Sequence, residues 1–109
     1  CLGNHEVRGG FNRPRAAATY YFPLFDVLYP DTSYAALDFG DYLSLVLLDT
    51  GHVSPIGGAQ ADWLGRTLAD RQDRPHLIVA NHVPAYPSYR TPTGVMGLFG
   101  TGDGNRRHW

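Results

Sequence analysis

A strand, a helix and a second strand follow one another in the middle of this chain, and their order limits the folds that it can adopt. Residues 42–48 are apolar and rich in strand-forming side chains, and residues 76–80 form a second such run. Between them, residues 59–71 place apolar side chains at a period near 3.6, and Pro75 prevents the helix from continuing. Strands joined through a helix pair in parallel, so the pattern predicts a right-handed βαβ unit in an α/β domain.

A β-hairpin is predicted immediately before this unit. Residues 34–39 and 42–48 flank the pair Gly40-Asp41, which favours a tight turn between two strands. The first strand alternates and the second becomes uniformly apolar toward its end, so the hairpin is expected to lead from a sheet edge into a buried sheet. We expect the apolar run at 77–80 to be a buried strand as well.

Loops are predicted on both sides of these elements. Residues 7–19 are rich in Arg, Gly and Pro and lack periodicity, with one short helical turn expected at 16–18. The aromatic cluster at 20–25 is broken by Pro23, which argues against a regular helix there. We interpret this cluster as a hydrophobic plug that holds a loop on the core, in preference to a platform for substrate. Pro and Gly from residue 81 onward predict a long C-terminal loop.

Composition narrows the function classes. A chain of 109 residues with 43% hydrophobic residues can build one small core. The formal net charge of -1 argues against a nucleic-acid binder or a membrane-surface binder, since both usually carry a basic excess. The longest apolar run, residues 45–48, is too short to cross a bilayer. The single cysteine, Cys1, cannot form an intrachain disulfide.

Polar side chains follow the predicted strands at points where open α/β sheets place their ligands. His82 comes directly after the apolar run at 77–80, and Asp49 and His52 come after the run at 42–48. At the start of the chain, Gly3 permits a tight turn from which Asn4 and His5 project an amide and an imidazole. Donors of this kind at two strand ends predict a shared divalent-metal site.

These motifs carry a family resemblance. Gly3-Asn4-His5-Glu6 and Val79-Ala80-Asn81-His82 resemble the third and fourth sequence blocks of the calcineurin-like metallophosphoesterases, within the purple acid phosphatase branch. Further segments agree in order with that branch: Leu48-Asp49-Thr50, residues 58–64, residues 82–86 and residues 104–109. The family's earlier Asp-x-His and Gly-Asp blocks and its later Gly-His-x-His block are absent. The chain therefore resembles a middle slice, residues 1–109, of one catalytic domain with a partial sheet sandwich.

The resemblance implies a phosphoric-ester hydrolase with a dinuclear metal centre, containing iron paired with zinc, manganese or a second iron. It implies that Asn4 and His82 bind one of the metals, and that His5 contacts the substrate phosphate or protonates the leaving alkoxide. Two donors cannot hold two metals, so we expect this slice alone to be inactive. Its partners would be a phosphate-ester substrate and the remainder of its own catalytic domain. An extracytoplasmic or secreted location is favoured by the resemblance only.

Several roles stay open at this point. Asn4 can instead stabilise its own turn. Glu6 can act beside the site, where it would orient an imidazole or bond backbone groups, or it can be an exposed acid that caps the next loop. His52 can contact the site or lie at its rim, while Asp49 is expected to bond its loop and not a metal. Arg106, Arg107 and His108 can meet a phosphate or form a solvated surface.

The function also has alternatives. A non-catalytic binding or scaffold domain can retain a phosphatase-like fold, and the choice between monoester and diester substrates is open. A serine or cysteine hydrolase is disfavoured, because the chain has no Gly-x-Ser-x-Gly turn and its one cysteine is Cys1.

Overall fold

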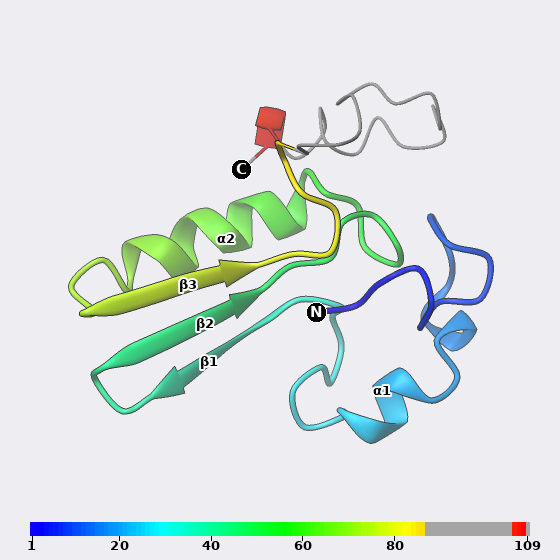
Figure 1. Cartoon of the computed structure of the whole chain (residues 1–109), viewed down its shortest axis with the longest axis horizontal. Helices are drawn as coiled ribbons and strands as arrows, with labels where there is room; N and C mark the ends of the chain where they lie inside the picture. Colours follow the sequence, from blue (N-terminus) through cyan, green and yellow to red (C-terminus); the bar gives the residue numbers. More distant parts are fainter. Residues whose placement is uncertain (87–105, 109) are drawn as a thin grey trace.

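The computed structural model describes residues 1–86 and 106–108. Six elements follow one another in the first of these ranges (Figure 1): η1 (Arg15–Ala17), α1 (Tyr21–Leu24), β1 (Ala35–Phe39), β2 (Leu43–Leu47), α2 (Ala59–Ala69) and β3 (His76–Ala80). Residues 106–108 are helical. Most of the predicted C-terminal loop, residues 87–105, lies outside the described residues.

The three strands form one mixed sheet in the order β1-β2-β3. β1 and β2 are antiparallel, with Phe39 opposite Leu43, and Gly40 in the turn between them adopts a positive φ of 56°. β2 and β3 are parallel, with Leu43 opposite His76, and α2 connects them. The predicted hairpin, the parallel strand pair and the α/β class are thus confirmed.

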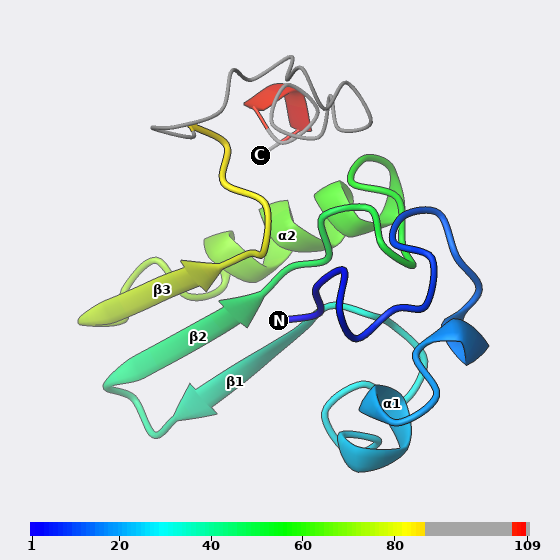
Figure 2. The same ribbon diagram turned by 45° about the vertical axis from the view of Figure 1, so that its right-hand side comes forward.

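The core is divided between the two sides of the sheet. On one side, α2 packs on the sheet through a buried cluster of Val46, Leu48 and Leu64. A second cluster includes Leu2 and Tyr29, and it joins the N-terminal segment and α1 to the sheet through Leu47 and its neighbours. Figures 1 and 2 show α1 beyond the end of the sheet at which β2 finishes, whereas α2 runs alongside the strands.

The prediction that β3 is a buried strand was wrong. Ile78 is 52% exposed and Val79 43% exposed, and β3 lies at the edge of the sheet formed by the described residues. An apolar run shows that a strand can be buried, but burial also requires a neighbour on both faces and both edges. Among the described residues, β3 pairs on one edge with β2 only.

The aromatic cluster differs in one respect from its prediction. Its residues include a single helical turn, α1, although no regular helix was expected. Pro23 is the third residue of this turn, where a backbone N–H has no intrahelical partner in any case, so proline costs no hydrogen bond there. Phe22 is buried, and the Arg15 guanidinium lies 3.6 Å from the centroid of its ring. Phe22 and Tyr21 pack on the core as a plug would, whereas Tyr20 and Leu24 are exposed, so the interpretation holds for part of the cluster only.

Two helix boundaries also differ slightly. α2 ends at Ala69, two residues before the predicted end, and the short turn η1 covers Arg15–Ala17 where 16–18 was expected. Among the described residues, the helices are all too short to cross a bilayer as apolar spans.

Candidate functional site

Asn4 and His82 come together although 78 positions separate them in the chain. The imidazole Nε2 of His82 lies 2.8 Å from Oδ1 of Asn4, a hydrogen bond in which His82 Nε2–H donates to the amide oxygen. Both side chains are exposed. His82 follows the end of β3 by two residues, in a turn where the Asn81 amide donates to the Val83 carbonyl at 2.6 Å. The structure therefore brings together the two predicted donors at the edge where β2 and β3 end.

Gly3 makes room for this contact. A Cβ added to residue 3 would lie 2.9 Å from His82 Nδ1 and 2.9 Å from Glu6 Oε2, closer than a real Cβ approaches other atoms. The Gly3 N–H also donates to Glu6 Oε2 at 3.0 Å. Glu6 thus bonds the backbone of its own turn, one of the two roles expected for it, while its carboxylate lies near the imidazole of His82. Because residue 3 has no side chain, the His82 ring and the Glu6 carboxylate can both lie against its backbone.

Gly3→Ala is expected to push the His82 ring away from Asn4. The new methyl group must displace either the ring or the Glu6 carboxylate, and the carboxylate is held by the Gly3 N–H. We expect loss of the Asn4–His82 contact and a destabilisation of about 1–3 kcal/mol from overpacking. NMR shifts of His82 and a urea unfolding curve measure the two effects.

Gly65→Ala is the matched control, because nothing lies within 4 Å of the corresponding Cβ position in α2. This substitution is expected to stabilise the chain by about 0.5–1 kcal/mol through the better helix propensity of alanine. Unchanged His82 shifts in Gly3→Ala would contradict the packing described for residue 3.

Asp49 organises the loop that follows β2. Its side chain is fully buried, and it accepts hydrogen bonds from four groups: Ser33 Oγ at 2.5 Å and the N–H groups of His52 at 2.7 Å, Val53 at 2.9 Å and Ser54 at 2.6 Å. Three of these donors bond Oδ2 and one bonds Oδ1. The prediction that Asp49 bonds its loop is confirmed.

Gln60 fixes the same loop from the other side, a role that was not predicted for it. Its Oε1 accepts from the Asp49 N–H at 2.8 Å, and its Nε2 donates to the carbonyls of Asp49 at 3.0 Å and Pro55 at 2.8 Å. The side chain is 1% exposed. An amide in the first turn of an otherwise amphipathic helix, on its buried side, is the sequence signal that points to such a bridge.

His52 is buried beside His82 and does not lie at an exposed rim. The two ring centroids are 5.3 Å apart, and Phe11 stacks on His52 with a centroid separation of 4.3 Å. His52 Nδ1 lies 3.3 Å from the Gly10 carbonyl oxygen. Burial lowers the pKa of His52, against the opposing effect of the Asp49 carboxylate. The lowered pKa favours the neutral imidazole.

The other predicted site residues lie around this centre. His5 is exposed. Arg106 donates to the Ala85 carbonyl at 2.6 Å, and its guanidinium lies 5.4 Å from the Tyr86 ring centroid. The His108 ring lies against Gly57, whose Cβ position would be 2.9 Å from it. The short helix at 106–108 is thus in contact with the loops that follow β2 and β3.

Asn4 and His82 alone are too few donors for a dinuclear metal centre. Within that part of the chain, no group of three or more His, Cys, Asp or Glu side chains is arranged to hold a metal ion. Asn4 and His82 offer one neutral oxygen and one nitrogen, types that zinc, manganese and iron accept. The pair fits part of such a site.

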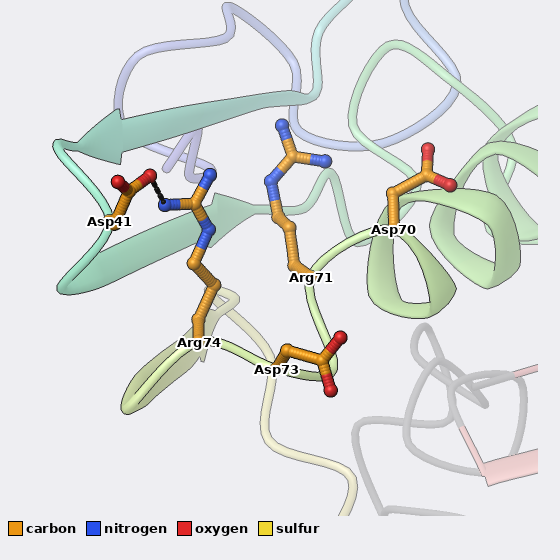
Figure 3. A pocket seen from close by; sticks show the side chains of 5 residues that line it. All are labelled: Asp41, Asp70, Arg71, Asp73 and Arg74. Atoms are coloured by element: carbon orange, nitrogen blue, oxygen red, sulfur yellow. Dashed lines mark hydrogen bonds and ion pairs between the residues drawn. The ribbon is translucent and has the colours of Figure 1, made fainter.

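A hollow lies at the opposite end of the sheet, where β3 begins. It has a volume of about 240 Å³ and is lined by Asp41, Asp70, Arg71, Asp73 and Arg74. Figure 3 shows Arg74 reaching toward Asp41, to which it makes an ion pair of 2.7 Å. Arg71 pairs with Asp38 at 2.9 Å and lowers the pKa of that carboxyl to about 2. These pairs tie the hairpin turn to the loop after α2, and we assign them a structural role.

Comparison with known proteins gives no relative: no protein-family model, no curated protein and no solved structure matches this chain.

Proposed function

We propose that this chain is part of the catalytic domain of a metal-dependent phosphoric-ester hydrolase of the metallophosphoesterase type. The observation that carries the proposal is the contact between Asn4 and His82 at the edge where the parallel strands end. Their motifs are the two that resemble the family, and they are far apart in the sequence. Their meeting is what a shared metal site requires.

The chemistry follows from the types of side chain at this edge. Two metal ions, when bound, would polarise the phosphoryl oxygens and supply an activated water for in-line attack. Asn4 would hold a cation without adding a negative charge that repels phosphate, and His82 would supply a neutral nitrogen. His5, next to Asn4 and exposed, would donate a hydrogen bond to the phosphate or a proton to the leaving oxygen.

An incompletely covered sheet face supports the view that more of the domain packs here. Strand register places Phe39 beside Leu43, and Leu37 beside Leu45 and Ile78, all on the face opposite α2. Phe39 is 54% exposed and Ile78 52% exposed. A second layer on this face would bury these side chains, and it would convert the mixed sheet into the sandwich that the resemblance implies.

Hydrolysis of p-nitrophenyl phosphate with added Zn²⁺, Mn²⁺ or Fe²⁺ tests the proposal. We expect essentially no turnover by the 109-residue chain and metal-dependent turnover by the complete parent protein. In the parent protein, Asn4→Ala and His82→Ala are expected to remove most of this activity. A parent protein that is inactive with every metal and ester would support a scaffold domain. Robust turnover by the 109-residue chain would contradict the proposal that the remaining metal ligands lie in the rest of the catalytic domain.

A further inference from the structure

The buried Nε2 atom of His52 has no hydrogen-bond partner in the described part of the chain. His52 Nδ1 faces the carbonyl oxygen of Gly10, which can only accept, so Nδ1 carries the proton. Nε2 of the neutral ring then presents a bare lone pair. Burying such an acceptor without a partner costs about 1–3 kcal/mol, and folded proteins rarely tolerate it without a ligand or a function.

The His52 and His82 rings are almost as close as two imidazoles that bind one metal ion. When two imidazoles bind one ion through bonds of about 2.1 Å at angles of about 90–109°, their ring centroids lie about 4.5–5.2 Å apart. The observed separation is 5.3 Å. Two donor atoms on such an ion lie about 3.0–3.4 Å apart, and Asn4 Oδ1 and His82 Nε2 are already 2.8 Å apart.

The surroundings favour a cation at this place. The Glu6 carboxylate lies beside the His82 ring and is joined to the Gly3 N–H. The carboxylates of Asp49 and Glu6 both act electrostatically on His52. His82 is exposed, so its side chain can adjust when an ion binds.

We propose that His52 Nε2 is a third donor, together with Asn4 Oδ1 and His82 Nε2, to a single divalent transition-metal ion. The ion would take the place of the proton that His82 Nε2 donates to Asn4, and this proton would move to His82 Nδ1 or to solvent. The inference rests on the proposed function in one respect, since it takes Asn4 and His82 as metal donors. It goes beyond that function because three donors with an open fourth position form a zinc-type site, which this chain can fill without the rest of its domain. Phe11 stacks on the His52 ring, and the Gly10 carbonyl fixes its tautomer.

Isothermal titration with Zn²⁺ tests this site in the 109-residue chain. The exposed thiol of Cys1 is itself a zinc ligand, so all variants carry Cys1→Ser. We expect one Zn²⁺ per chain. His52→Asn keeps a donor for the Gly10 carbonyl and removes Nε2, and His52→Phe keeps the ring against Phe11. Both variants are expected to bind Zn²⁺ more than about tenfold more weakly than the Cys1→Ser chain. About tenfold is the smallest loss that usually follows when a hydrogen-bond partner of a metal ligand is removed.

His76→Asn is the matched control, because His76 lies at the other end of β3 beside Tyr42, with a ring separation of 4.6 Å. Its zinc affinity is expected to be unchanged, and circular dichroism verifies that each variant is folded. Nitrogen-15 NMR of the imidazoles gives a second readout, in which the His52 Nε2 resonance shifts on adding Zn²⁺. The inference fails if folded His52 variants bind Zn²⁺ as tightly as the Cys1→Ser chain while Asn4→Ala and His82→Ala bind it weakly. In that case Asn4 and His82 remain the proposed donor pair. Absence of stoichiometric zinc binding also overturns the inference, whereas the proposed function is decided separately by the phosphatase assay.

Discussion

Asp49→Ala is expected to unfold the chain at 25 °C. The substitution removes a fully buried carboxylate and leaves the N–H groups of His52, Val53 and Ser54 without their acceptor. Each buried group left unpaired costs about 1–3 kcal/mol, so the total approaches the roughly 5–15 kcal/mol that stabilises an ordinary domain. Urea unfolding followed by circular dichroism measures the loss.

Asp73→Ala serves as the control, because Asp73 is an exposed acid in the loop between α2 and β3. A surface substitution of this kind changes stability by about 0.5 kcal/mol or less. If Asp49→Ala unfolds at the same urea concentration as Asp73→Ala, the loop after β2 is not held by the carboxylate, and the placement of His52 loses its explanation.

His5→Ala in the complete parent protein is expected to lower kcat for p-nitrophenyl phosphate by about 10²–10⁴-fold. This is the usual contribution of a positioned acid or base to proton transfer. The side chain follows Asn4 directly and is exposed, so its removal leaves the described packing unchanged. We therefore expect a large fall in kcat with normal folding and normal metal content.

His5→Gln separates the two roles given to His5. Glutamine can donate a hydrogen bond to the phosphate but cannot protonate a leaving alkoxide. Recovery of most of the activity would assign hydrogen bonding, whereas activity as low as that of His5→Ala would assign proton transfer. His76→Ala, at the far end of β3, is expected to keep full activity. A kcat for His5→Ala within twofold of the parent value would remove His5 from the reaction.

The sequence predicted the strands and the helix well, because their signals are local. The β1–β2 hairpin follows from two strand-forming runs on either side of Gly40. The β2–α2–β3 crossover follows from a segment of helical periodicity between two apolar runs. The exposure of β3 could not be predicted in the same way. Ile78 and Val79 are apolar in any context, and only the neighbours present in three dimensions decide whether they are covered.

The site was predictable to a similar extent. The strand-end rule applies to His82, which follows β3, whereas no strand precedes Asn4 in the described residues; their side chains nevertheless meet as predicted. The space at Gly3 and the partners of Gln60 depend on contacts between segments distant in sequence, which local patterns do not specify. The burial of His52 likewise depends on the loop that carries Phe11. Residue types predicted the kind of chemistry, and the packing of loops decided which side chains stand next to one another.

The most direct test is anomalous diffraction from crystals of the complete parent protein grown with Zn²⁺ or Mn²⁺. The central claim is that Asn4 and His82 bind the same cation. It predicts an anomalous peak about 2.0–2.2 Å from both Asn4 Oδ1 and His82 Nε2. A metal bound elsewhere in the domain, with Asn4 and His82 still joined to each other by a hydrogen bond, would contradict it.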